Sequence, residues 1–170
     1  MLASVSLHQL SWSTPANQPL FTDLELSFGP GRTGLIGRNG TGKSTLLRLI
    51  AGSVHPMSGS VTITGTLGML EQSVQVTEGK SIGEQLGVAT DLALLDRLEQ
   101  GLGSVEDAGN ADWSLPGRIQ AALHQVGLPD FDPNRPLDTL SGGQRTRLSL
   151  ARLILAQPDI ILLDEPTNNL

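Results

Sequence analysis

Residues 37–44 have the sequence Gly-Arg-Asn-Gly-Thr-Gly-Lys-Ser, and this stretch decides the fold. A glycine, four further residues and then Gly-Lys-Ser is the spacing of a P-loop. The glycines allow successive backbone N–H groups to turn inward, and the helix that follows directs the positive end of its dipole to the same place. The stretch therefore predicts a cradle for the phosphates of a nucleotide.

The context of the loop favours this interpretation over a glycine-rich turn with a solvent-exposed lysine. We expect a short strand at Thr33–Ile36 before the loop, and a helix from Lys43 to Ala51 that Gly52 ends. In such a loop Lys43 reaches the β and γ phosphates, and the hydroxyl of Ser44 ligates Mg²⁺. The residues expected to bind the nucleotide here are Gly37, Arg38, Asn39, Gly40, Thr41, Gly42, Lys43, Ser44 and Thr45.

Two acidic residues, Asp164 and Glu165, directly follow the apolar run Ile160–Leu163. Such a run is typical of a parallel strand that is covered on both faces, and ligands collect at the carboxyl ends of parallel strands. We therefore expect the acids to face the P-loop, with Asp164 helping to hold Mg²⁺ and Glu165 orienting or deprotonating an attacking water. Acids that merely end a strand at the surface are the alternative, which the presence of both halves of a hydrolytic site disfavours.

A second glycine-containing motif, Leu-Ser-Gly-Gly-Gln at 140–144, begins the longest predicted helix, 141–156. Ser141 and Gln144 alone have the spacing of a capping box, which accounts for stability. A capping box does not require Gly142 and Gly143, each of which costs about 1 kcal/mol in a helix relative to alanine. The two glycines suggest that a phosphate approaches the positive helix end closely.

The remaining sequence predicts the architecture around these motifs. Period-two alternation within Ser4–Phe28 indicates strands with one polar face, and a further pair of strands is expected at Val61–Ile63 and Leu67–Leu70, joined around Gly65. Helical periodicity covers Ser81–Val126, apart from a polar break at 101–111. These patterns predict strands at the N-terminus followed by a long helical stretch.

The predicted fold class is α/β, with a P-loop NTPase core whose sheet is mostly parallel. An antiparallel β subdomain lies at the N-terminus, and a helical subdomain over about residues 73–157 is inserted into the core. We expect residues 1–170 to belong to a single domain.

The composition limits the kinds of partner. A formal net charge of −6 and a pI of about 4.9 give no broad basic field for nucleic acid. There are no cysteines, which excludes disulfides, thiolate metal sites and cysteine nucleophiles. The N-terminus lacks the features of a signal peptide, and no apolar run approaches the roughly 20 residues of a membrane helix. We expect a cytoplasmic protein without direct membrane insertion.

Residues 37–44, 140–144 and Ile-Leu-Leu-Asp-Glu-Pro-Thr at 161–167 together resemble the ATP-binding cassette (ABC) ATPase family in order and spacing. The resemblance covers essentially the whole chain. It implies that the domain binds ATP with Mg²⁺, hydrolyses it, and pairs head to tail with a second such domain around two ATP molecules. In that arrangement Ser141 and Gly143, within the motif that also contains Gly142 and Gln144, contact the γ phosphate bound by the opposite domain.

The resemblance also assigns two single residues. Gln72 links the γ phosphate and Mg²⁺ to the helical subdomain, whereas a solvated glutamine is the alternative. The family usually stacks adenine on an aromatic residue of the first strands, for which Trp12 is the candidate and an ordinary strand-face aromatic the alternative. The family continues with an aspartate, a core strand and a switch histidine, so we expect the domain to be incomplete at Leu170.

Within the family, Glu165–Asn168 and Arg145–Leu148 are similar to the ABC-F branch, which contains soluble proteins with paired domains and mostly ribosomal partners. Asn169 departs from that branch, where histidine is more frequent. The ATP-binding subunit of a membrane transporter, with a permease as partner, is the first alternative. A non-catalytic ATP-binding fragment is the second.

Overall fold

The computed structural model describes residues 2–70 and 79–165, and the chain groups into two compact units. Unit 1 comprises Met1–Leu70 and Pro158–Asp164, and unit 2 comprises Glu71–Gln157 and Glu165–Leu170. Each unit has its own hydrophobic core. The predicted helical insertion over about residues 73–157 lies within unit 2.

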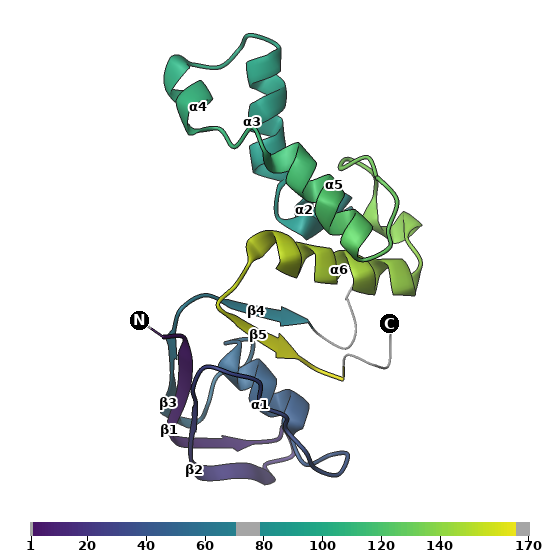
Figure 1. Cartoon of the computed structure of the whole chain (residues 1–170). Helices are drawn as coiled ribbons and strands as arrows, with labels where there is room; N and C mark the ends of the chain where they lie inside the picture. The colour runs from purple at the N-terminus through teal and green to yellow at the C-terminus, as the bar shows by residue number, and fades with distance from the viewer. Residues whose placement is uncertain (1, 71–78, 166–170) are drawn as a thin grey trace. The chain divides into compact units, whose positions relative to one another are not determined.

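The first sheet of unit 1 is antiparallel with the strand order β2-β1-β3 (Figure 1). Its strands are β1 (Ser4–Ser13), β2 (Pro19–Phe28) and β3 (Ser58–Thr64). Val5 and Leu7 are buried as alternation requires, and an irregularity in the ladder between Leu7 and Leu10 allows Leu10 to join them. Gln9 has φ +47° there, and a Cβ at Gly59 would collide with its carbonyl oxygen, so this close backbone approach requires glycine.

Helix α1 (Lys43–Ile50) packs its apolar face against this sheet. Leu46, Leu49 and Ile50 are buried and form one core with the inward-facing side chains of β1. The helix ends at Ile50, one residue earlier than predicted, Ala51 is its C-cap, and Gly52 then turns the chain with φ +74°. The start of the helix, and with it the P-loop, is therefore attached to the core of unit 1.

A second, parallel sheet pairs β4 (Leu67–Leu70) with β5 (Ile160–Leu163). Asp159 fastens the starts of the two strands. Thr66 donates to the Asp159 Oδ2 atom from both its backbone N and its Oγ1, each at 2.8 Å, and Asp159 N donates to Thr66 Oγ1 at 3.0 Å. The hydrogen bonds from Thr66, the backbone one first, hold the pKa of the Asp159 carboxyl below its usual value of 3.8.

The two strands expected on either side of Gly65 are present as β3 and β4, and Gly65, at φ +101°, turns the chain from one sheet into the other. Two other predicted details of the strands are wrong. Thr33–Ile36 forms no strand, because none of the described strands pairs with it to supply hydrogen-bond partners. Strand β5 is not covered on both faces, because Ile161 and Leu163 remain 51% and 45% exposed.

Unit 2 is built from helices in its described part, residues 79–157 and 165. They are α2 (Ile82–Leu86), α3 (Ala89–Glu99), α4 (Val105–Asn110), α5 (Leu115–Gln125), the short 3-10 helix η1 (Leu137–Thr139) and α6 (Gly142–Ala156). Helix α6 is the longest, as predicted, and both α2 and α5 pack against it (Figure 1). Leu148 and Ala151 of α6 are fully buried in this core.

The predicted polar break at 101–111 contains helix α4, which is a correction to the sequence analysis. A capping box begins the helix: Ser104 Oγ accepts from Asp107 N at 3.0 Å, and Asp107 Oδ2 accepts from Ser104 N at 3.0 Å. Hydrophobic periodicity gave no sign of α4 because none of its residues is buried. Neither α4 nor any other helix in residues 2–70 and 79–165 has the length and hydropathy of a membrane-spanning segment.

Candidate nucleotide-binding site

Side chains of the P-loop donate hydrogen bonds to two backbone carbonyl groups of the same loop. Lys43 Nζ donates to the carbonyl oxygens of Gly37 and Arg38 at 2.8 and 3.0 Å. Thr41 Oγ1 also donates to the Arg38 carbonyl, at 2.9 Å. The loop thus holds the ammonium group of Lys43 by two of its own backbone oxygens.

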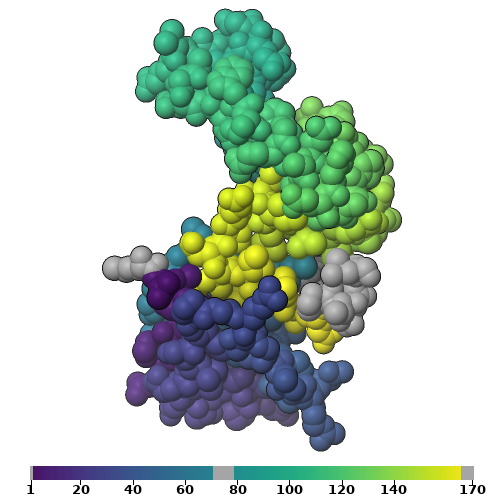
Figure 2. Space-filling model, in the orientation of Figure 1, coloured from purple at the N-terminus to yellow at the C-terminus, as the bar shows by residue number. Residues whose placement is uncertain are grey.

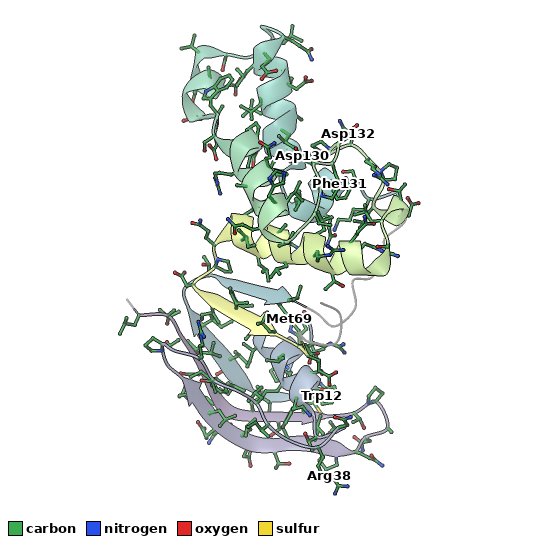
Figure 3. The ribbon with its side chains drawn as sticks, turned by 45° about the vertical axis from the view of Figure 1, so that its right-hand side comes forward. Trp12, Arg38, Met69, Asp130, Phe131 and Asp132 are labelled. Atoms are coloured by element: carbon green, nitrogen blue, oxygen red, sulfur yellow. The ribbon has the colours of Figure 1, made fainter. Side chains whose placement is uncertain are left out.

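The loop lies at the surface of unit 1. Residues 36–41 are exposed, and the blue atoms that precede α1 reach the surface in Figure 2. Arg38 points outward from the loop (Figure 3). A polyanion can therefore approach the loop from solvent.

The start of α1 has the properties of an anion site. Its N-cap is Gly42, in the left-handed conformation with φ +93°, and no side chain caps the helix. The N–H groups of the first helical turn therefore have no side-chain cap and carry the positive end of the helix dipole. Gly42 has a second constraint, because a Cβ there would lie 2.8 Å from Leu20 Cδ2 and 2.9 Å from Phe21 Cζ, both on β2.

Ser44 and Asp164 lie together. Ser44 Oγ donates to Asp164 Oδ1 at 2.9 Å, although the two residues belong to distant parts of the chain. Asp164 is only 5% exposed, and its backbone N continues the parallel ladder by donating to Leu70 O at 3.2 Å. The end of β5 therefore places a buried carboxylate beside the first turn of α1.

These two side chains fit Mg²⁺. A hydroxyl and a carboxylate are hard oxygen donors, and Mg²⁺ usually takes only one or two carboxylates, with phosphates and waters completing its shell. No cluster of three or more His, Cys, Asp or Glu residues occurs in the described part of the chain. Ser44 and Asp164 would hold the metal from the protein side.

The other predicted site residues are Glu165, Gln72, residues 166–169 and Trp12. Glu165 is exposed and has φ +46°, so the chain turns sharply after Asp164. Gln72 and residues 166–169 lie outside the described residues. Trp12 is half-buried on β1, where it pairs with Phe21 in the β1–β2 ladder and packs against the core of unit 1 (Figure 3). Its proposed contact with adenine stays a prediction.

The motif at 140–144 forms the expected capping box in unit 2. Ser141 Oγ accepts from Gln144 N at 3.3 Å, and Gln144 Oε1 accepts from Ser141 N at 2.9 Å. Gly142 and Gly143 are exposed, and a Cβ built on either meets no atom within 4 Å. No steric contact among the described residues therefore requires these two glycines.

The fold and the loop define a P-loop nucleotide-binding domain of α/β class. The sequence profile of the ABC transporter family matches residues 21–168, and the chain belongs to this family. Members of the family are ATPases in general. The family resemblance and the predicted fold class are thereby confirmed.

Two curated relatives and one solved structure show the range of the family. The energy-dependent translational throttle protein EttA of Mycobacterium tuberculosis is 36% identical over 89% of this chain and 31% of its own length. The aliphatic sulfonates import ATP-binding protein SsuB of Corynebacterium glutamicum is 41% identical over 79% of this chain and 49% of its own length. The chain therefore spans about a third of EttA and about half of SsuB.

The solved structure is that of a metal-chelate type ABC transporter in an inward-facing conformation. It matches 100% of this chain and 62% of its own, with a TM-score of 0.64 and 27% identity. The family thus includes both transporter components and a protein named for its effect on translation.

Proposed function

We propose that this chain binds Mg-ATP and that, when complete and paired with a second ABC domain, it hydrolyses ATP to ADP and phosphate. The hydrogen bond between Ser44 and Asp164 carries the proposal. It brings a metal-binding pair of oxygens to the start of α1, where phosphates bind most favourably. ABC family membership, shown by residues 21–168, supports the same conclusion.

Each residue of the site has a proposed task. The backbone N–H groups of the loop and the ammonium of Lys43 bind the phosphate oxygens, and two carbonyl contacts hold that ammonium in the loop. Ser44 and Asp164 hold Mg²⁺, which when bound neutralises charge on the β and γ phosphates. Glu165 orients the attacking water and accepts its proton, while Gln72 senses the γ phosphate.

A second domain is proposed to complete the site. The open space around Gly142 and Gly143 supports this, since the described part of the chain does not fill it. Ser141 stands at the N-terminus of α6, a helix of 15 residues, and would offer its hydroxyl with nearby N–H groups to the γ phosphate held by the other domain. Binding of ATP would then bring two domains together head to tail.

For the biological role we propose an ABC-F type factor of the cytoplasm that associates with the ribosome. The similarity to EttA supports it, as does the resemblance of Glu165–Asn168 to that branch. The alternative is the ATP-binding subunit of a membrane transporter, which the similarity to SsuB supports. Cosedimentation of the whole protein with ribosomes favours the first role, and copurification with a permease favours the second.

ATP binding is tested by titrating the chain with a fluorescent ATP analogue in the presence of Mg²⁺. We expect Lys43→Ala to abolish measurable binding, because the ammonium is the side-chain cation that the loop holds. Lys80, the only other lysine of the chain, provides a matched control, and Lys80→Ala should bind like the parent. Equal binding by the Lys43→Ala protein would reject the proposed site. Binding without turnover in the complete protein would leave only a non-catalytic ATP-binding role.

A further inference from the structure

The exposed apolar side chains of unit 2 are concentrated in one short segment. Leu102, Val105 and Trp113 are 72%, 92% and 54% exposed, and they are the only large apolar side chains that are exposed in the described part of unit 2. All three lie in the stretch that connects α3 to α5 and includes α4. Grouped exposed apolar residues in a soluble protein commonly mark an interaction site.

Local hydrogen bonds hold this segment together, although α4 does not contribute side chains to the core of unit 2. None of the residues of α4 is buried, yet a capping box begins the helix, and Trp113 Nε1 donates to the Ala108 carbonyl at 3.1 Å. The indole is therefore held against α4 while more than half of its surface remains in solvent. These hydrogen bonds hold α4 and the indole of Trp113 in place, while Leu102, Val105 and Trp113 remain exposed.

This segment and the helix α3 that precedes it carry a strong net negative charge. Residues 89–114 contain six acidic residues and one basic residue, Arg97, so they contribute −5 to a chain of net charge −6. The acidic residues are Asp91, Asp96, Glu99, Glu106, Asp107 and Asp112. Hydrogen bonds from Ser104 lower the pKa of Asp107, and hydrogen bonds from Ser114 lower that of Asp112, so both stay ionised at neutral pH.

We propose that residues 99–114 form a docking surface for a basic protein segment that carries large apolar side chains. The acidic charge complements lysine and arginine, while Leu102, Val105 and Trp113 supply the apolar contact. The charge disfavours the phosphate backbone of a nucleic acid, and it disfavours a second copy of the same acidic surface. The proposal goes beyond ATP binding and does not depend on it.

The probe is a synthetic peptide of alternating Lys-Lys and Leu-Leu pairs, added to the full chain. The chain has two tryptophans, so a Trp12→Phe background leaves Trp113 as the only tryptophan reporter. We expect the peptide to bind with a blue shift of Trp113 emission as the indole leaves water. Hydrogen exchange should become slower over residues 99–114.

Two sets of variants test the two components of the surface. Leu102→Ser with Val105→Ser should weaken peptide binding at least about tenfold, whereas Met57→Ser, an exposed residue of unit 1, should leave it unchanged. Glu99→Lys with Glu106→Lys should weaken binding about tenfold and reduce its dependence on salt, whereas Asp138→Lys, elsewhere in unit 2, should have little effect. Circular dichroism of each variant checks that the helices remain.

Several outcomes would overturn the proposal. Equal binding of a peptide with serine in place of leucine would leave only non-specific charge attraction. A single-stranded RNA that shifts Trp113 emission would identify a nucleic-acid surface instead. A blue shift that depends on protein concentration without peptide would identify a second copy as the occupant. If a surface variant loses its helices, the test is hydrogen exchange of the parent protein with and without the peptide. Exchange that becomes slower only outside residues 99–114 would contradict the proposed docking surface.

Discussion

Ser44 Oγ lies 2.9 Å from Asp164 Oδ1, and this hydrogen bond joins the first turn of α1 to the residue that follows β5. The two residues are 120 positions apart in the sequence, so only the folded core of unit 1 brings them together. A buried carboxylate requires a partner, and Ser44 provides one within this unit. The oxygen atoms of this pair are also those proposed to hold Mg²⁺, so hydrogen bond and metal share the same atoms.

Removing either member of this pair should uncouple ATP binding from Mg²⁺. We expect Ser44→Ala and Asp164→Asn each to reduce the enhancement of ATP affinity by Mg²⁺ at least about tenfold, because each loses a metal ligand. Titrations of ATP with Mg²⁺ and with EDTA measure the enhancement. Ser53→Ala, a change at an exposed serine just after α1, is the control and should preserve it. An unaltered enhancement in both variants would contradict the proposed metal site.

Glu165 is proposed to act on the attacking water rather than on binding. In a protein with complete paired domains, Glu165→Gln should slow ATP hydrolysis about a hundredfold or more while leaving ATP bound, because it removes the base. Phosphate release measures turnover, and size-exclusion chromatography with ATP should show an accumulated dimer. Glu106→Gln makes the same chemical change on α4 and serves as the control. Turnover at the parental rate would show that another group accepts the proton.

Alanine substitutions at Gly42 and Gly40 distinguish two reasons why the P-loop contains glycine: the positive φ and the lack of space for a Cβ atom. Both have a positive φ, +93° and +83°, so alanine at either should cost roughly 1 kcal/mol of stability. Only Gly42→Ala also drives a Cβ into Leu20 and Phe21, which should add about 1–3 kcal/mol. Urea unfolding of both variants measures the difference. Equal losses would mean that β2 yields to the new methyl group at no cost.

The Asp159–Thr66 contacts should make stability depend on pH in the acid range. Folding lowers the pKa of Asp159 below 3.8, so its contribution is fully present above that pH and is lost as the pH falls through the folded-state value. Asp159→Asn should therefore destabilise the protein at pH 7 and approach the parent's stability in strong acid. Urea midpoints of both proteins over this range test the sign, since glutamate and aspartate residues elsewhere titrate alike in both. A gap between the two that widens toward low pH would refute the assignment.

The elements that sequence reasoning predicted well are those whose cause is local. The P-loop spacing, the capping box of Ser141 and Gln144, and the apolar face of α6 each depend on neighbouring residues in the chain. The approach of Asp164 to Ser44 is not local, but it followed from the rule that the carboxyl ends of parallel strands meet the ligand. The general rule on parallel strands was therefore sufficient to predict that Asp164 lies near the start of α1.

The errors and omissions have a different origin. Thr33–Ile36 has strand-forming residues, yet a strand also needs a partner that no single segment can supply. Helix α4 depends on Ser104 and Asp107 rather than on burial, so a search for apolar periodicity passes over it. The contact of Gly42 with Leu20 likewise joins segments whose proximity no spacing rule expresses.

The hydrogen bonds between Asp159 and Thr66 also determine which acidic residue lies beside Ser44. From that anchored end, β5 is four residues long, and the next residue is Asp164. Deleting one residue from β5 would bring Glu165 into the place of Asp164 beside Ser44. The length of β5 therefore determines that Asp164, the proposed metal ligand, lies beside Ser44, and that Glu165, the proposed base, does not.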